Sequence, residues 1–115
     1  MQDDITDGVN YLIDQGVADP DRIAIFGGSY GGYATMAGLT FTPDLYAAGI
    51  NFVGVVDLEL LQEDSNRNSR RFGGFYDELR LEWGEPDDPE DMKYIIETSP
   101  LRQAHKIKSP VLIIH

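Results

Sequence analysis

Hydrophobic positions near the start of the chain follow a helical period. They fall at i, i+4, i+7 and i+8 and form one apolar stripe: Ile5, Val9, Leu12 and Ile13. This spacing predicts an amphipathic helix over Asp3–Gln15. The acidic first turn suits the positive end of the helix dipole. Gly16 stands where a left-handed cap would end the helix.

Three later stretches are short and almost continuously apolar, without a helical period. They cover Arg22–Phe26, Ala47–Val56 and Val111–Ile114. Runs of this kind are typical of parallel strands that are covered on both faces. Asn51 is the polar exception in the second run, and we expect a buried, hydrogen-bonded amide there. Pro110 fits directly before the third run because a proline is tolerated at the start of a strand.

Helical signals fill the intervals between these runs. Small and unbranched residues over Gly32–Thr40 favour a helix that packs closely on a sheet. Asp88–Asp91 is a helix start with a capping residue, a proline and two acids, and the helix should reach about Thr98. Ser99–Ala104 repeats this signal for a shorter helical turn. Strands that alternate with helices predict an α/β fold with a parallel sheet.

The first apolar run ends in a glycine-rich turn that carries a single serine. The pattern Gly27-x-Ser29-x-Gly31 lies between a predicted strand and a predicted helix, which is the context of a nucleophile elbow. Such a sharp turn strains the backbone of the serine, and side chains two residues away would collide with the strand or the helix. Amides at the start of the helix favour negative charge on an attacked carbonyl oxygen.

A phosphate-binding or purely structural turn is the alternative, because it shares the strand-turn-helix context. A phosphate loop needs a lysine followed by serine or threonine, and a dinucleotide-binding turn needs Gly-x-Gly-x-x-Gly. No lysine lies near Ser29, and Gly27, Gly28 and Gly31 do not have the second spacing. The elbow is therefore the preferred interpretation.

Composition excludes several classes of function and leaves the fold prediction unchanged. The chain has 115 residues, a formal net charge of −11 and no cysteine. The negative charge argues against nucleic acid and anionic membranes as partners. We expect no cofactor and no metal site, since there is no thiolate and His105 and His115 lie outside any ligand spacing. No apolar run has the length of a membrane span and no signal peptide is visible, so we expect a cytoplasmic location.

Leu58–Gly84 is polar, charged and difficult to assign. It contains a basic island at residues 66–71, acidic flanks and four interleaved aromatic residues: Phe72, Phe75, Tyr76 and Trp83. Basic and aromatic residues together can bind single-stranded nucleic acid, but the acidic flanks argue against that here. Two interpretations stay open, a helical excursion over the top edge of the sheet and an aromatic wall of a substrate pocket.

Several motifs together resemble one family of α/β-hydrolases. Gly27–Ala34 is similar to the serine-nucleophile segment of the prolyl oligopeptidase family, whose members cleave peptides. Ala18–Ile23 is similar to the family's lead-in to the elbow strand. Ser109–His115 is similar to the strand that ends just before its catalytic aspartate. The resemblance implies that residues 1–115 form a partial α/β-hydrolase catalytic domain, with three parallel strands and flanking helices.

The resemblance also implies roles for individual residues. Ser29 would attack a peptide substrate and form an acyl-enzyme, while the backbone amide of Tyr30 would be one donor of the oxyanion hole. The side chain of Tyr30, together with Val55 and Leu58, matches the wall of the primary specificity pocket. Leu58 departs from the aromatic residue often found there in dipeptidyl peptidases, and residues 54–61 look closer to acylaminoacyl-peptidase-like members.

Other parts of the family's machinery are expected outside this sequence. The resemblance places the catalytic aspartate and histidine after His115, and a propeller domain and a second oxyanion donor before Met1. The chain alone is therefore expected to be inactive, unless His105 or His115 acts as the base with Asp57 as the acid. Two other functions stay open: a carboxylesterase on the same scaffold, and a non-catalytic remnant with a structural or peptide-binding role.

Overall fold

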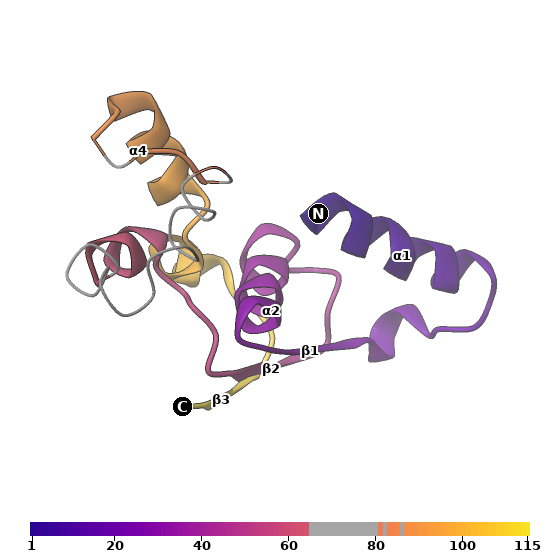
Figure 1. Cartoon of the computed structure of the whole chain (residues 1–115). Helices are drawn as coiled ribbons and strands as arrows, with labels where there is room; N and C mark the ends of the chain where they lie inside the picture. The colour runs from indigo at the N-terminus through magenta and orange to yellow at the C-terminus, as the bar shows by residue number, and fades with distance from the viewer. Residues whose placement is uncertain (65–80, 82, 86) are drawn as a thin grey trace.

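The computed structural model describes residues 1–64, 81, 83–85 and 87–115 (Figure 1). Helices and strands alternate along the chain, as the sequence predicts for an α/β fold. In order they are α1 Gln2–Asp14, η1 Pro20–Arg22, β1 Ala24–Gly28, α2 Tyr30–Phe41, β2 Ala48–Phe52, α4 Pro89–Glu97, η2 Pro100–Lys106 and β3 Val111–Ile114. Residues 58–64 are also helical. The basic island, Phe72, Phe75 and Tyr76 lie outside the described residues.

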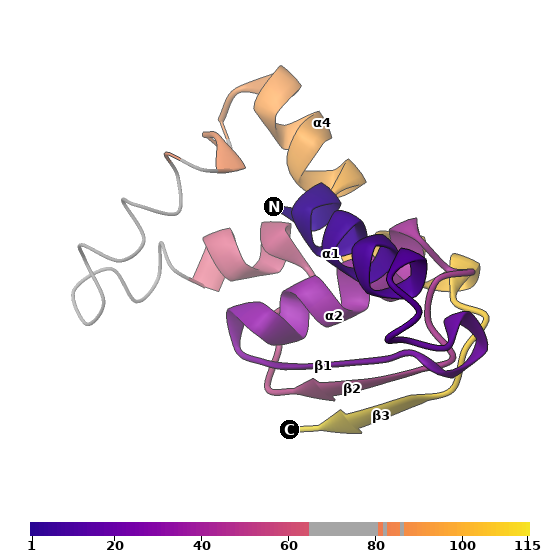
Figure 2. The ribbon, with the colours of Figure 1, turned by 90° about the vertical axis from the view of Figure 1, so that its right-hand side faces the viewer.

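The strands form one parallel sheet in the order β1-β2-β3. Phe26 lies opposite Ile50, and Ile50 lies opposite Leu112 on the next strand. Because all three strands run in the same direction, their carboxyl ends meet at one edge of the sheet (Figure 2). The predicted three-stranded parallel sheet is confirmed.

The helices lie on one side of this sheet (Figure 2). Met36 and Leu39 of α2 pack with Tyr46 in a core that also contacts Ile25 and Val111. Gly49 of β2 makes room for this packing, since a Cβ atom there would lie 2.4 Å from Leu39 Cδ1. Among the described helices, none combines the length and apolar character needed to cross a bilayer.

A second core forms beyond the carboxyl edge of the sheet. It consists of buried Leu58, Trp83 and Ile95, with Tyr33 and Val55 packed against it. The α4 helix that supplies Ile95 begins as the sequence predicts, because the Asp88 side chain accepts hydrogen bonds from the second and third helical amides. This core joins α4 and the start of the 58–64 helix to the outer side of α2.

The boundaries of two strands, β1 and β2, differ from the sequence prediction. β1 does not begin at Arg22, which belongs to η1, and it extends through the glycines to Gly28. β2 ends at Phe52, not at Val56, because Val53 turns into the left-handed region with φ of 45°. The predicted β3 boundaries are confirmed, and Gly16 ends α1 with φ of 69°.

Candidate active site

Ser29 occupies the sharp turn between β1 and α2. Its backbone has φ of 54° and ψ of −118°, a conformation that costs a non-glycine residue about 1–3 kcal/mol. Its carbonyl oxygen accepts hydrogen bonds from the amides of Gly32 and Tyr33 at 2.9 and 3.1 Å, which starts α2. Although Ser29 is the N-cap residue, its hydroxyl makes no capping hydrogen bond. The side chain is exposed at the carboxyl edge of the sheet.

Glycines give this turn its shape. A Cβ atom on Gly27 would lie 2.1 Å from the carbonyl oxygen of Gly31 and 2.3 Å from its carbonyl carbon. The first turn of α2 therefore lies directly on the end of β1, and only glycine fits between them. A Cβ atom on Gly31 itself would meet nothing within 4 Å, so the collision arises at one of the two positions only.

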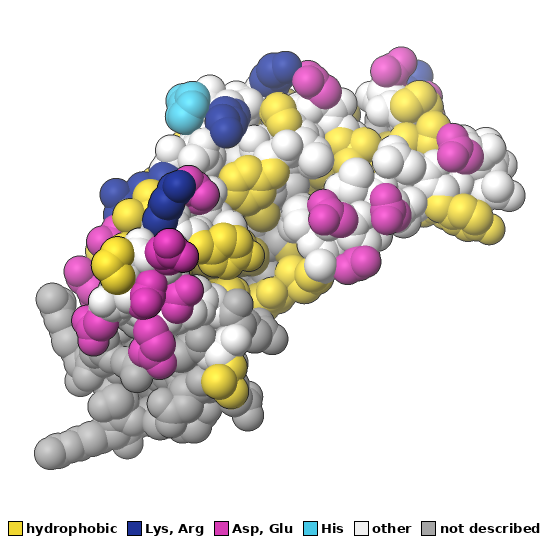
Figure 3. Space-filling view, turned by 90° about the horizontal axis from the view of Figure 1, so that it is seen from above, with side chains coloured by type: hydrophobic (Ala, Val, Ile, Leu, Met, Phe, Trp, Pro, Cys, Tyr) yellow, Lys and Arg dark blue, Asp and Glu magenta, His cyan; other side chains and the backbone are white. Residues whose placement is uncertain are grey.

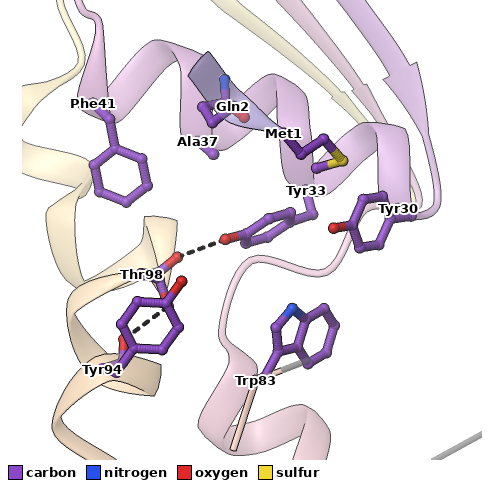
Figure 4. Close-up of a pocket in the computed structure, with 9 residues that line it drawn as sticks. All are labelled: Met1, Gln2, Tyr30, Tyr33, Ala37, Phe41, Trp83, Tyr94 and Thr98. Atoms are coloured by element: carbon purple, nitrogen blue, oxygen red, sulfur yellow. Dashed lines mark hydrogen bonds between the residues drawn. The ribbon is translucent and has the colours of Figure 1, made fainter. Parts of the chain in front are cut away.

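Tyr30, the first residue of α2, points into an aromatic cluster. Its ring is parallel to that of Trp83, with an angle of 5° between planes and 6.3 Å between centroids. Tyr33, one helical turn later, lies 5.7 Å from Tyr30 and 6.2 Å from Trp83. Figure 4 shows the three rings side by side next to the start of α2. The residue that follows Ser29 is thus held by aromatic contacts on two sides.

This cluster forms one wall of a cavity of about 460 Å³. Most of the side chains that line the cavity are aromatic: Tyr30, Tyr33, Phe41, Trp83 and Tyr94. Met1, Gln2, Ala37 and Thr98 complete the lining (Figure 4). The Tyr33 hydroxyl donates a hydrogen bond to the Thr98 carbonyl oxygen at 3.1 Å and ties α2 to the end of α4. Burial, together with the nearby hydroxyls of Tyr30 and Tyr94, raises the pKa of Tyr33 to about 12.

The three residues assigned to a specificity pocket have different surroundings. Tyr30 lines the cavity, whereas Val55 and Leu58 are absent from its lining. Leu58 is fully buried with Trp83 and Ile95, and Val55 packs against that core. Both stand behind the aromatic wall and are not part of its surface, so their place in a specificity pocket stays a prediction.

Sequence reasoning missed most of the cavity's aromatic residues. The interleaved aromatics of Leu58–Gly84 point to Trp83, but Tyr33, Phe41 and Tyr94 lie outside that segment. Helical spacing could have identified Tyr33, since it lies three residues after Tyr30 and so shares its side of α2. Nothing in the sequence places Tyr94, on a distant helix, beside them.

The two histidines are exposed and lie near opposite ends of β3. His105 belongs to η2, which leads into the amino end of β3, and that end is opposite to the Ser29 edge. His115 follows β3 at the same edge as Ser29, but β2 separates the two strands. Among the described residues, no group of three His, Cys, Asp or Glu side chains is arranged to hold a metal ion.

The Asp57 carboxylate lies in a structural environment, with hydrogen bonds to one oxygen and an ion pair to the other. Oδ1 accepts the amide hydrogens of Glu59 and Leu60 at 3.1 and 3.3 Å, which caps the helix at 58–64. Oδ2 lies 3.0 Å from Arg102 Nε, and Arg102 also pairs with Glu59. This buried carboxylate therefore fastens the helix to η2, and it is not directed at Ser29 by any of these contacts.

Acidic side chains gather over α1 and α4 on the helical face of the molecule, with hydrophobic side chains between them (Figure 3). Both helices carry acids in their first turn: Asp3 and Asp4 in α1, Glu90 and Asp91 in α4. These acids contribute to the formal net charge of −11, and none of them is among the residues that line the cavity.

Known proteins share this segment closely. The chain is 42% identical over 113 residues to dipeptidyl aminopeptidase BIII of Pseudoxanthomonas mexicana, which covers 98% of this chain and 16% of that protein. It matches a puromycin-hydrolyzing peptidase of Mycobacterium tuberculosis with a TM-score of 0.71 and 34% identity, over 92% of this chain and 15% of the other. An acylaminoacyl peptidase of Pyrococcus horikoshii matches with a TM-score of 0.70 and 30% identity, over 97% and 17%.

These relatives include a dipeptidyl aminopeptidase and an acylaminoacyl peptidase, so the finer likeness to acylaminoacyl peptidases stays a prediction. The fold prediction is confirmed, since the matched structures include prolyl endopeptidases and an acylaminoacyl peptidase. The chain spans about one sixth of the length of the dipeptidyl aminopeptidase it matches. The model of the prolyl oligopeptidase family matches residues 1–115. With its elbow at Ser29, the chain belongs to the prolyl oligopeptidase family.

Proposed function

We propose that this chain is the nucleophile-bearing part of a serine peptidase catalytic domain and that Ser29 is its nucleophile. The observation that carries the proposal is the left-handed backbone of Ser29, held by the close contact of Gly27 and Gly31. A β1–α2 turn without a catalytic role has no need for a strained serine at its apex. The peptidase names of the family's members support an amide substrate.

The residues of the turn divide the chemistry between them. Ser29 Oγ attacks the carbonyl carbon of the peptide bond, and its proton passes to a general base. The carbonyl oxygen gains negative charge beside the first turn of α2, where the Tyr30 amide is one donor. Collapse of the tetrahedral intermediate releases the amine and leaves an ester on Ser29, which water then hydrolyses.

The general base and its orienting acid come from other parts of a longer protein in this proposal. Asp57 is occupied by a helix cap and an ion pair, and His105 lies in η2, before the amino end of β3. The relatives are longer peptidases, so the remainder of the catalytic domain and a propeller domain are the proposed partners. A cytoplasmic location belongs to the same proposal.

The substrate side chain next to the cleaved bond is proposed to meet Tyr30. Val55 and Leu58 form the rear of the same wall, because they pack against the core that holds Trp83 and Tyr33. Substitution of Val55 or Leu58 should shift the aromatic wall and so change which substrate side chains are preferred. Substitution of Tyr30 should change the same preference by removing a direct contact with the substrate.

Covalent labelling tests the nucleophile. The full-length protein that carries this chain should react with a fluorophosphonate probe, and Ser29→Ala should abolish the reaction. Ser109→Ala is the matched control, since its hydroxyl donates to the Tyr46 carbonyl oxygen away from the elbow, and it should label normally. Labelling that survives in Ser29→Ala contradicts the assignment.

Turnover separates the peptidase from the alternatives. The full-length protein should cleave an N-acyl-aminoacyl anilide, whereas a carboxylesterase would cleave only a p-nitrophenyl ester and a remnant would cleave neither. The 115-residue chain alone should cleave no anilide, because loss of the triad partners costs on the order of 10⁶ in kcat. Repeated, Ser29-dependent anilide cleavage by the short chain would return His115 or His105, with Asp57, to consideration.

A further inference from the structure

The carboxyl end of β2 is joined directly to the elbow. The amide of Ser29 donates a hydrogen bond of 3.0 Å to the carbonyl oxygen of Phe52. This bond continues the β1–β2 ladder by one residue beyond Gly28, so the nucleophile's own backbone is the last rung. The position of Ser29 therefore depends on where Phe52 presents its carbonyl oxygen.

The residue after Phe52 is strained without an evident packing reason. Val53 has φ of 45°, which is rare for a β-branched residue, and its side chain is 42% exposed. Its amide donates to the carbonyl oxygen of Ile114 on β3 at 2.8 Å. The Phe52 carbonyl and the Val53 amide belong to one trans peptide group, so this group joins the elbow on one side to β3 on the other, and the left-handed turn follows directly after it.

A buried amide closes the turn against α2. Asn51 is 2% exposed, and its Oδ1 accepts the amide hydrogen of Gly54 at 2.9 Å. This bond presses Gly54 against Gly32 in the first turn of α2. A Cβ atom on Gly54 would lie 2.3 Å from Asn51 Oδ1 and 2.6 Å from Gly32 Cα, and Gly32 in turn donates to the Ser29 carbonyl oxygen.

We propose that residues 51–54, here called the β2 turn, are a positioning element for the nucleophile, with Asn51 as its central residue. The inference rests on the proposed peptidase function. The β2 turn fixes Ser29 from both sides, through its amide at Phe52 and through Gly32 at its carbonyl. Catalysis depends steeply on such placement, since a shift of about 1 Å can reduce the rate about 100-fold.

A simple structural clip would have a different signature. It would end β2 and contribute to folding stability, but the rate of acylation per folded molecule would not depend on it. A positioning element must also affect kcat while leaving the KM nearly unchanged, because Asn51 is buried and makes no surface for the substrate. The two roles therefore separate in the kinetics of folded protein.

The test uses Asn51→Ala in the full-length protein that carries this chain. We expect kcat for an anilide and the rate of fluorophosphonate labelling to fall about tenfold or more, with KM changed less than about threefold. Asn51→Asp retains an oxygen acceptor at the same place and should restore most of the labelling rate. Asn51→Ser cannot reach Gly54 and should behave like Asn51→Ala, which keeps the test open if the alanine variant does not fold.

Thr40→Ala is the matched control for lost stability. Thr40 is also a fully buried polar residue of this fold, but it lies near the far end of α2 and bonds only to helix carbonyls. It should lower the unfolding temperature without slowing the labelling of folded protein. Equal labelling rates in Asn51→Ala and wild type would overturn the positioning role alone. Wild-type protein that does not label at Ser29 would refute the proposed function as well.

Discussion

The two faces of the sheet carry similar apolar residues in very different surroundings. On the face under α2, Ile25 and Val111 pack against the core of Met36, Leu39 and Tyr46, and Gly49 lies under Leu39. On the opposite face, Phe26 is 69% exposed and Leu112 is 55% exposed. Figure 2 shows the helices above the sheet and no described element beneath it.

The pattern of hydrophobic residues specifies where the strands lie but not how many of their faces are covered. Continuous apolar runs predict strands that are covered twice, and the same strands are covered once by the described residues. The covered face also carries the elbow, since Gly27 and Asn51 both lie on it. Backbone placement near Ser29 should therefore depend on the covered face, while self-association should depend on the open one.

The largest expected effect lies on the covered face at the elbow. Gly27→Ala would place a methyl group 2.1 Å from the Gly31 carbonyl oxygen, a contact that only backbone movement can relieve. We expect the free energy of unfolding to fall by about 4 kcal/mol or more, or the chain not to fold. Urea denaturation followed by circular dichroism measures this.

The neighbouring glycine is the matched control, because its missing side chain would face the open side. A Cβ atom on Gly28 would meet only Phe52, 3.3 Å from Cδ1 of an exposed ring that can turn away. Gly28→Ala should cost less than about 1 kcal/mol. Equal losses for the two alanine variants would show that the covered face has no special role in shaping the elbow.

The same comparison applies to large side chains. Leu39 is 1% exposed under α2, and Leu39→Ala should cost about 3 kcal/mol because it leaves a cavity. Phe26→Ala removes a larger side chain from the open face and should cost less than about 1 kcal/mol. Thermal or urea unfolding of both variants gives the difference. A larger loss for Phe26→Ala would mean that the open face is covered in solution.

Self-association should respond to the open face and not to the covered one. β1 is an edge strand of the described sheet, and its exposed Phe26 continues an apolar surface toward Leu112. Such an edge is a template for pairing between copies, so the 115-residue chain should form oligomers despite its charge. Phe26→Lys should shift size-exclusion and light-scattering profiles toward monomer. Wild-type chain that elutes as a stable monomer would contradict this.

An effect smaller than those of Gly27→Ala and Leu39→Ala is expected on the outer side of α2. Tyr33→Phe removes the hydrogen bond to the Thr98 carbonyl oxygen and should cost about 1 kcal/mol. Burial raises the pKa of Tyr33 to about 12, above its unfolded value near 10. The unfolded chain therefore loses this proton first, and the stabilisation present below pH 10 disappears as the pH rises toward 12.

Unfolding measured between pH 9 and about pH 12 checks the sign, with stability expected to fall through this range. Tyr33→Phe should have a shallower decline. Part of the decline should remain, because burial also raises the pKa of Tyr46. An unchanged slope in Tyr33→Phe would place the titrating group elsewhere.

The sequence predicted the elements better than their ends. β3 begins directly after Pro110, whose ring and missing amide hydrogen mark a boundary that local rules detect. Gly27 and Gly28 have low strand propensity, yet β1 includes them because β2 supplies ladder partners at Asn51 and Phe52. Local rules cannot foresee the end of β2 either, since a valine seldom adopts the left-handed conformation that tertiary contacts impose here.

Part of the candidate site could also be predicted from local sequence, and part of it could not. The glycine spacing around Ser29 is a local signal, and the prediction of strained geometry is confirmed by its φ of 54°. Hydrophobic neighbours on both sides of Asn51 predict a buried, hydrogen-bonded amide. Its burial and its hydrogen bond from Gly54 confirm this prediction. The aromatic cavity depends on contacts between α2, α4 and Trp83 that no periodicity encodes.

The position of Trp83 has an optical consequence. It is the one tryptophan of the chain, so the red-shifted part of the chain's fluorescence comes from a single ring. That ring is 8% exposed and lies parallel to Tyr30, the residue after Ser29. A change in polarity or contact beside Ser29 therefore alters the emission of this one indole. The chain carries an intrinsic spectroscopic reporter next to its elbow, readable without any attached dye.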